Sequence, residues 1–359
     1  MRLNTQRPVT LLRANASAEI GGGHVMRCLA LGVELANSGC EVNLAVGRGS
    51  LAAIPALARS GLKVIELGCE GDVEDPTTLA RAFGRACDVL IVDSYAHSAR
   101  HEAAWRSFAR YIVAIDDLAN RLHDCDLLIN QAMGLSADVY LALVPSGCRV
   151  LLGPDFAMLR PEFLLARDGS LARRANSVRT DRLAISFGMT DSLGASVRVL
   201  DELAAARVPV AVDILMGPSS PHLAGVGECA RRHPFPATLI IGAEDVASVL
   251  AKCDVCVGAG GASSWERCCL GVPSILIALA DNQLPNARQL AAAGAAIDLG
   301  ILKDVRKGAI ADALQSLIEG EHAHEKLAEM AMRAAALCDG AGTARVRAAI
   351  QALDSGRLA

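Results

Sequence analysis

The residues best suited to chemistry lie at a glycine-rich turn near the start of the chain. Residues 9–12 form a short apolar run that predicts a strand, Gly21-Gly22-Gly23-His24 comes after it, and a helical pattern follows. Consecutive glycines let the backbone approach a ligand closely, and the free N–H groups at the start of a helix favour an anion such as a sugar-nucleotide phosphate. An imidazole that titrates near neutrality suits proton transfer. The turn therefore predicts ligand contacts at Gly22 and Gly23 beside a general base at His24, although a histidine that merely caps a tight turn has the same sequence.

Two loops of small residues in the second half of the chain could hold phosphate in a similar way. Residues 187–192 read Phe-Gly-Met-Thr-Asp-Ser, residues 258–264 read Gly-Ala-Gly-Gly-Ala-Ser-Ser, and each loop follows a predicted strand. Backbone N–H groups and hydroxyls in such loops can surround an anion. An ordinary tight turn has the same composition. The residues predicted to contact phosphate are Gly188, Thr190, Gly261, Ser263 and Ser264.

Polar side chains that suit a sugar or a ribose follow the second of these loops. Glu266 falls in the first turn of a helix predicted to begin near residue 265, where a carboxylate can accept hydrogen bonds from ribose hydroxyls or simply complement the helix dipole. Residues 281–287 read Asp-Asn-Gln-Leu-Pro-Asn-Ala and predict a loop after a strand. Gln283 and Asn286 in this loop are candidate ligands of sugar hydroxyls or N-acetyl groups, and a solvated polar turn is the alternative.

The elements that must position these residues form two α/β halves. Short apolar runs alternate with amphipathic helical patterns, which is typical of βαβ units and a parallel sheet. The rhythm breaks at residues 152–154, and the charged stretch 160–176 predicts a connection between domains. Loops at the carboxyl ends of two such sheets face a cleft between the domains, where a ligand is expected. The predicted strands are residues 9–12, 42–46, 64–67, 89–93, 112–116 and 127–130 in the first half and 182–187, 210–216, 237–241, 255–258, 274–277 and 296–298 in the second.

Length and composition exclude several classes of protein. A chain of 359 residues suits two domains of ordinary size, and its formal net charge of −4 argues against a protein that coats nucleic acid. The sequence has no apolar run long enough for a membrane-spanning helix and no signal-peptide pattern at its N-terminus, so we expect a cytoplasmic protein without an integral membrane segment. We also expect a monomer.

The 12 cysteines predict neither a metal site nor a disulfide framework. They are scattered through apolar segments without paired metal-ligand spacing, which is typical of small core residues. The one close pair, Cys253-Asp254-Val255-Cys256, leads into a predicted buried strand rather than opening a helix, and this disfavours a redox motif.

The glycine turn with His24, the stretch from Gly258 to Glu266 and the 281–287 segment together resemble the GT-B superfamily, which includes the UDP-N-acetylglucosamine transferase of peptidoglycan synthesis. A closer resemblance is to the UDP-2,4-diacetamido-2,4,6-trideoxy-β-L-altropyranose hydrolases of pseudaminic acid biosynthesis. The similar motifs follow one another in order, from residue 11 to about residue 300. They are residues 13–27, 92–95, 115–118, 123–130, 151–163 and 186–191.

The resemblance implies a GT-B type α/β fold with two Rossmann-like domains. Residues 1–160 would carry the catalytic base and residues 177–359 would bind UDP. Water would replace UDP at the anomeric carbon with inversion and without a metal or other cofactor, and the free sugar would feed pseudaminic acid synthesis and flagellin glycosylation. His24 would be the general base, Asn15 and Tyr95 would line the sugar side, and Arg160 would bind substrate.

One departure from the resembled pattern affects the sugar or uridine contact. Trp265 stands where some relatives have an asparagine. The glycine loop before it keeps the pattern.

Two other functions are compatible with the same motifs. A GT-B glycosyltransferase with a UDP-N-acetylhexosamine-type donor would use the histidine position on an acceptor hydroxyl instead of water. A silent nucleotide-sugar binder would not need a base at His24. Transferases that reach lipid acceptors usually show an apolar and basic patch in the first domain, and residues 46–54 have this character only weakly.

Overall fold

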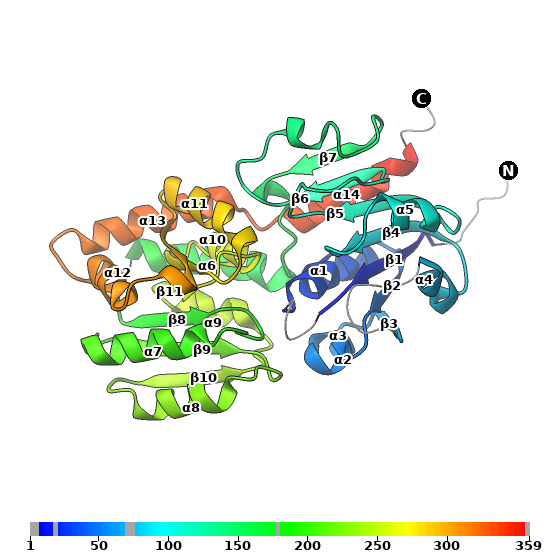
Figure 1. The fold of residues 1–359 in the computed structure, drawn as a ribbon. Helices are drawn as coiled ribbons and strands as arrows, with labels where there is room; N and C mark the ends of the chain where they lie inside the picture. Colours follow the sequence, from blue (N-terminus) through cyan, green and yellow to red (C-terminus); the bar gives the residue numbers. More distant parts are fainter. Residues whose placement is uncertain (1–6, 17–20, 69–75, 177–179, 356–359) are drawn as a thin grey trace. The chain divides into compact units, whose positions relative to one another are not determined.

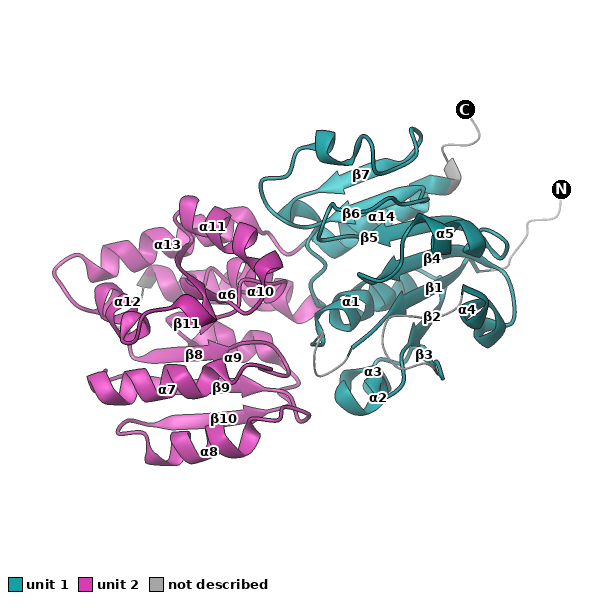
Figure 2. Ribbon diagram, in the orientation of Figure 1, with its two compact units in different colours: residues 1–160, 341–359 teal, residues 161–340 magenta. Residues whose placement is uncertain are grey.

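The computed structural model describes residues 7–16, 21–68, 76–176 and 180–355 (Figure 1). The chain divides into two compact units (Figure 2). Unit 1 comprises residues 1–160 together with 341–359, and unit 2 comprises residues 161–340. Each unit is built on its own parallel sheet, as the alternating sequence pattern predicts.

Unit 1 contains a seven-stranded sheet in the order β3-β2-β1-β4-β5-β6-β7. Its central strands are buried on both faces, with Leu11, Leu12 and Leu44 fully inaccessible, because helices cover a parallel sheet on both sides. The chain runs outward from β1 to β3 and then returns to place β4 beside β1. The elements are β1 Val9–Ala14, α1 Gly23–Asn37, β2 Glu41–Val46, α2 Ser50–Ala53, α3 Ala56–Arg59, β3 Lys63–Glu66, α4 Pro76–Phe83, β4 Cys87–Asp93, α5 Ala99–Trp105, β5 Ala109–Ile115, β6 Leu127–Asn130, η1 Ala137–Tyr140, β7 Arg149–Leu152, η2 Pro154–Phe156 and α14 Gly342–Ser355.

Unit 2 repeats this winding with six strands in the order β10-β9-β8-β11-β12-β13. Its core is a large apolar cluster that includes Ile185, Ile214 and Val257, each fully buried. Here the chain reverses between β8 and β11. The elements are α6 Pro161–Asn176, β8 Arg182–Ser186, α7 Ala195–Ala206, β9 Ala211–Met216, α8 Leu223–Arg232, β10 Ala237–Ile241, α9 Val246–Lys252, β11 Val255–Gly258, α10 Ser263–Cys269, β12 Ser274–Ala278, η3 Asp281–Gln283, α11 Leu284–Ala292, β13 Ala296–Ile301, η4 Leu302–Asp304, α12 Ala309–Ile318 and α13 Ala323–Leu337.

The twelve predicted strands are confirmed, with ends that shift by a few residues, and the structure adds β7. β7 lies at the edge of the sheet, and only its Leu151 is buried. The predicted connection between domains at residues 160–176 is wrong. These residues contain helix α6, which belongs to unit 2. Arg174 of this helix donates hydrogen bonds to the carbonyl oxygens of Cys253 and Leu270 at 2.7 and 3.1 Å.

The predicted second domain, 177–359, differs from unit 2 at both ends. Helix α6 joins unit 2, and residues 341–359 join unit 1 because α14 packs against α1 and η2. The hydroxyl of Thr343 donates to the Leu159 carbonyl at 2.8 Å, and Arg347 Nε lies 2.9 Å from Glu34 Oε1. A Cβ at Gly342 would lie 2.3 Å from the Ala157 carbonyl oxygen, so this close approach requires glycine.

Candidate functional site

The candidate site of unit 1 lies where the strand order reverses, at the carboxyl ends of β1 and β4. Ligands of open α/β sheets bind at such a switch point. Asp93 ends β4 and is followed by Tyr95, while Asp117 follows β5, the next strand along the sheet. The first turns of α1 bring His24 and Arg27 to the same edge. These five side chains form the switch-point cluster.

His24 lies between the two carboxylates of this cluster. Its side chain is 9% exposed, with Nδ1 4.0 Å from Asp93 Oδ1 and Nε2 4.0 Å from Asp117 Oδ2. Both distances exceed hydrogen-bond length, and the buried Nδ1 has no hydrogen-bond partner among the residues that the structure describes. The Tyr95 ring packs edge-on against the imidazole, with ring centroids 4.6 Å apart. A proton gained by this imidazole would be attracted to two negative charges.

Arg27 binds both carboxylates and holds them in place. Its Nε and Nη2 lie 2.6 and 2.7 Å from the Asp93 oxygens, and its Nη1 and Nη2 lie 2.9 and 2.8 Å from those of Asp117. Burial acts to raise the pKa of Asp117, but the Arg27 guanidinium outweighs it and holds this pKa below its usual range. Two carboxylates and one guanidinium leave a formal charge of −1, which an imidazolium at His24 would neutralise.

Tyr95 and Asn15, predicted to line the sugar side, both lie at this edge. The Tyr95 hydroxyl donates to Asp117 Oδ2 at 3.2 Å, and burial, followed by the Asp117 charge, raises its pKa well above the ordinary value. Asn15 follows β1, is 2% exposed, and accepts a hydrogen bond from Arg13. Their contact with a sugar stays a prediction.

The remaining unit 1 candidates are the turn glycines and Arg160. Gly22 is buried at the N-cap of α1, and Gly23 is exposed with open space where a Cβ would be. Residues 17–20 of the predicted turn lie outside the described residues. Arg160 is half-buried at the last position before α6, and its predicted role stays a prediction.

The first predicted phosphate loop of unit 2 follows β8 at the second switch point. Gly188 has φ +83° and is exposed, which leaves its backbone accessible, and the Thr190 carbonyl accepts a hydrogen bond from Ser220 Oγ at 2.6 Å. However, Asp191 accepts hydrogen bonds from the backbone N–H groups of Ala195 and Ser196 at 2.8 and 2.9 Å. The Asp191 carboxylate thus occupies the start of α7. Phosphate contacts at Gly188 and Thr190 stay predictions, and they would involve the loop without the N–H groups of α7.

The second loop, 258–264, lies beside the first because β11 pairs with β8. The N–H of Ala259 donates to the Ser186 carbonyl at 3.2 Å, and Asn286 Nδ2 donates to the Gly260 carbonyl at 2.8 Å. A Cβ at Gly261 would lie 3.6 Å from Gln283 Nε2. The structure therefore brings together the candidates of this loop and those of the 281–287 segment, although their ligand contacts stay predictions.

One local expectation in this region needs correction. Residues 281–287 form η3 and the first turn of α11, not a loop, because Pro285 suits the first turn of a helix. Trp265 is 2% exposed on α10, and its effect on the sugar or uridine contact stays a prediction. Glu266 is half-buried in the first turn of the same helix.

Sequence reasoning missed four charged residues as site members. Asp93 and Asp117 stand at strand ends, a position that could have been used as a signal. Arg27 and Arg267 each lie three residues after a candidate, His24 and Ser264, on a helix. That spacing places side chains on one helix face, so it too was a usable signal.

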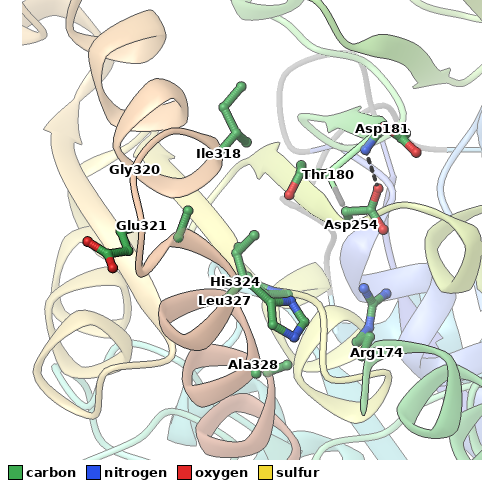
Figure 3. A pocket seen from close by; sticks show the side chains of 13 residues that line it. Arg174, Thr180, Asp181, Asp254, Ile318, Gly320, Glu321, His324, Leu327 and Ala328 are labelled. Atoms are coloured by element: carbon green, nitrogen blue, oxygen red, sulfur yellow. Dashed lines mark hydrogen bonds between the residues drawn. The ribbon is translucent and has the colours of Figure 1, made fainter. Parts of the chain in front are cut away.

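A cavity of about 430 Å³ lies at the opposite, amino edge of the unit 2 sheet (Figure 3). Two of its charged side chains, those of Asp254 and Arg174, already have partners. Asp254 accepts hydrogen bonds from the N–H groups of Asp181 and Arg182, both at 2.9 Å, and Arg174 donates to backbone carbonyls. Burial lowers the Arg174 pKa to about 10. We therefore place no function in this cavity.

Within the described part of the chain, no helix is both long and apolar enough to cross a membrane, and no cluster of His, Cys, Asp or Glu suits a metal ion. Every cysteine there is a free thiol, and Cys69 lies outside it. Cys253 precedes β11 and Cys256 lies in it, and burial raises the pKa of both thiols.

Comparison with known proteins agrees with this architecture. Residues 240–342 match the glycosyltransferase family 28 C-terminal domain. The MurG crystal structure from Acinetobacter baumannii has a TM-score of 0.68 at 15% identity and covers 96% of this chain and 99% of that one. The chain has a GT-B fold, as predicted.

Two curated relatives are similar in sequence. The spore coat polysaccharide biosynthesis protein SpsG of Bacillus subtilis (strain 168) is 31% identical over 182 residues, which cover 49% of this chain and 50% of that protein. This chain thus spans about half the length of SpsG. The UDP-2,4-diacetamido-2,4,6-trideoxy-beta-L-altropyranose hydrolase of Campylobacter jejuni is 25% identical over 286 residues, covering 79% of this chain and 96% of that enzyme. The chain is thus similar in sequence to a protein of spore coat polysaccharide biosynthesis and to a UDP-sugar hydrolase.

Proposed function

We propose that this protein is a hydrolase of a UDP-linked diacetamido trideoxy sugar, UDP-2,4-diacetamido-2,4,6-trideoxy-β-L-altropyranose. The observation that carries the proposal is the buried His24 imidazole, flanked at 4.0 Å by two carboxylates that Arg27 bridges. Similarity to the Campylobacter jejuni enzyme of that name, over most of both chains, supports the substrate class. The free sugar would serve pseudaminic acid synthesis and flagellin glycosylation, and we expect a cytoplasmic monomer.

The proposed reaction is a single displacement by water. His24 takes a proton from water as its oxygen attacks the anomeric carbon, and general-base catalysis of this kind contributes about 10²- to 10⁴-fold in rate. The glycosidic C–O bond breaks, and its electron pair leaves with the β-phosphate of UDP. One displacement inverts the anomeric centre. Loop 258–264 would stabilise the charge that develops on the leaving diphosphate, without a metal ion.

A glycosyltransferase is the second candidate function. The match of residues 240–342 to a glycosyltransferase domain and the similarity to MurG favour it. In that reaction His24 would take a proton from an acceptor hydroxyl, so the same cluster serves both chemistries. Dependence on an acceptor distinguishes them.

The test is UDP release from the UDP-sugar with a chelator and without any acceptor. We expect turnover by the wild type, loss of turnover in His24→Asn, and UDP affinity within a few-fold of wild type in that variant. His322→Asn is the matched control, because the His322 side chain is 76% exposed and pairs with the exposed Glu325. Turnover that requires an added sugar or lipid acceptor would support the transferase, and turnover by His24→Asn would remove the proposed base.

A further inference from the structure

Arg267 is a buried cation at the second switch point that the proposed reaction does not yet use. The residue is 1% exposed on α10, directly after Glu266. Its guanidinium donates to Ser274 Oγ at 3.2 Å, Ser263 Oγ at 3.2 Å, Ser264 Oγ at 3.0 Å and the Ala259 carbonyl at 2.5 Å. All four acceptors are uncharged, and Arg267 forms no ion pair with any residue that the structure describes.

These hydrogen bonds fix the conformation of loop 258–264. Three of the four acceptors belong to the loop, and the fourth, Ser274, begins β12. A Cβ at Gly258 would lie 2.4 Å from the Ser186 carbonyl oxygen and 3.1 Å from Arg267 Nη1, so the guanidinium packs directly against the glycine backbone. A planar guanidinium that binds several oxygens at once can hold such a loop in one shape.

The arginine also orients the loop hydroxyls. Because Ser263 Oγ and Ser264 Oγ accept hydrogen bonds from Arg267, their own hydrogens must point to other acceptors. The Ser264 hydroxyl has the Ala259 carbonyl at 3.4 Å. For Ser263, which is half-buried, no acceptor occurs among the described residues, so its hydroxyl remains available to an incoming oxygen.

An uncompensated buried charge is costly unless an opposite charge comes near. Arg174, another buried arginine of unit 2, also donates only to neutral oxygens, but these are carbonyls in the last turns of α9 and α10 or just beyond them. Helix C-terminal carbonyls carry partial negative charge, which compensates a cation. Around Arg267 the acceptors are three serine hydroxyls and the Ala259 carbonyl, and none of them lies at the C-terminal end of a helix.

We propose that Arg267 is a positioning residue for the diphosphate of the substrate. It holds loop 258–264 in a binding-competent shape, turns the Ser263 hydroxyl toward the phosphate, and places an uncompensated positive charge behind the loop. This inference rests on the proposed UDP-sugar substrate. Arg267 affects the binding of the diphosphate and not that of the uridine.

The test compares UDP with uridine as ligands of the wild type and of Arg267→Gln. Hydrogen bonds that involve a charged group are worth about 1.5–3 kcal/mol, or roughly 10- to 150-fold in affinity. We expect Arg267→Gln to weaken UDP binding by at least about 10-fold and uridine binding by less than about twofold. Arg267→Lys, which keeps the charge but not the planar fork, should lose less UDP affinity. Calorimetry for UDP and an NMR titration for uridine give the two constants.

Arg174→Gln is the matched control, because it removes another buried guanidinium, 7% exposed, from the same unit. It should lower the melting temperature while leaving UDP affinity within about twofold. If Arg267→Gln does not fold, Ser263→Ala keeps the arginine and should weaken UDP binding several-fold with uridine unchanged. Equal losses for UDP and uridine, or no loss for UDP, would overturn the role of Arg267.

The outcomes separate this inference from the proposed function. A wild-type protein that binds no UDP, or that binds it without hydrolysing the UDP-sugar, contradicts the proposed function. A wild-type protein that binds and hydrolyses, together with an Arg267→Gln variant of unchanged UDP affinity, contradicts only the role of Arg267.

Discussion

At the scale of single residues, the chemistry of unit 1 depends on charge balance around one imidazole. Asp93 and Asp117 each lie 4.0 Å from a ring nitrogen of His24, and Arg27 keeps both carboxylates in position. At 4 Å an ion pair near a protein surface interacts by about 4 kcal/mol before desolvation is counted. Both carboxylates therefore lie within Coulombic reach of the imidazolium that forms when water loses its proton.

Replacing Asp117 tests this balance. We expect Asp117→Asn to lower kcat/KM about 10- to 100-fold, because the imidazolium loses one of its two flanking charges, and to leave UDP affinity unchanged. Asp312→Asn is the control, since this carboxylate is 59% exposed and pairs with Arg306 in unit 2. Steady-state kinetics on the UDP-sugar measure the effect. An Asp117→Asn variant with wild-type kcat/KM would show that His24 does not depend on this carboxylate.

The sequence predicted His24 but not its partners, for a physical reason. A glycine turn before a helix is a local pattern, and a histidine in it can be recognised from neighbouring residues. The hydrogen bonds of Arg27 to Asp93 and Asp117 span 66 and 90 positions, so no local spacing reveals them. Only the pairing of β1 with β4 and of β4 with β5 brings these side chains together.

At the scale of elements, both candidate sites lie where a sheet reverses its winding. β1 and β4 flank the reversal in unit 1, and β8 and β11 flank it in unit 2. Hydrophobic periodicity and short apolar runs predicted these buried strands, because a sheet covered by helices on both faces needs strands that are continuously hydrophobic. The same reasoning failed for α6 and for residues 341–359. The charged residues of α6 suggested a connection between domains, and residues 341–359 were assigned to the second domain, whereas Arg174 and Thr343 bind carbonyl oxygens inside units 2 and 1.

Helix α14 gives an element-scale prediction. Val346 and Ile350 are 0% and 4% exposed, one turn apart on the buried face of this helix. Ile350→Ala should lower the free energy of unfolding by about 2–4 kcal/mol, because it leaves a cavity where α14 packs in unit 1. Met332→Ala, a truncation of a side chain that is 67% exposed, should change it by less than about 0.5 kcal/mol. Denaturant unfolding measures both, and equal effects would show that α14 is not anchored as described.

At the scale of the whole molecule, stability should depend on pH through a buried histidine. His97 is 1% exposed, and burial, followed by the charge of Arg13, lowers its pKa from 6.5 to about 3. The unfolded chain therefore binds a proton that the folded chain does not between these values. The stability contributed by neutral His97 is present above pH 6.5 and is lost as the pH falls toward 3.

Removing this group should flatten the pH dependence of unfolding. We expect the slope of the unfolding free energy between pH 4 and pH 6 to be smaller in His97→Gln than in wild type, by up to about 1.4 kcal/mol per pH unit. His322→Gln should keep the wild-type slope, because His322 is exposed. Denaturant titrations at a series of pH values give the slopes. Identical slopes for wild type and His97→Gln would mean that His97 titrates normally in the folded protein.

The product that receives the oxygen atom of water tests the central claim most directly. The UDP-sugar is incubated with the protein in ¹⁸O-water, with chelator and without acceptor, and the products are read by mass spectrometry before mutarotation exchanges the label. Attack at the anomeric carbon predicts ¹⁸O on the anomeric oxygen of the free sugar and unlabelled UDP. Label in the UDP phosphate would contradict the account, because water would then attack phosphorus and the base assigned to His24 would serve the wrong atom. Absence of turnover until an acceptor is added would contradict the hydrolase and support a transferase.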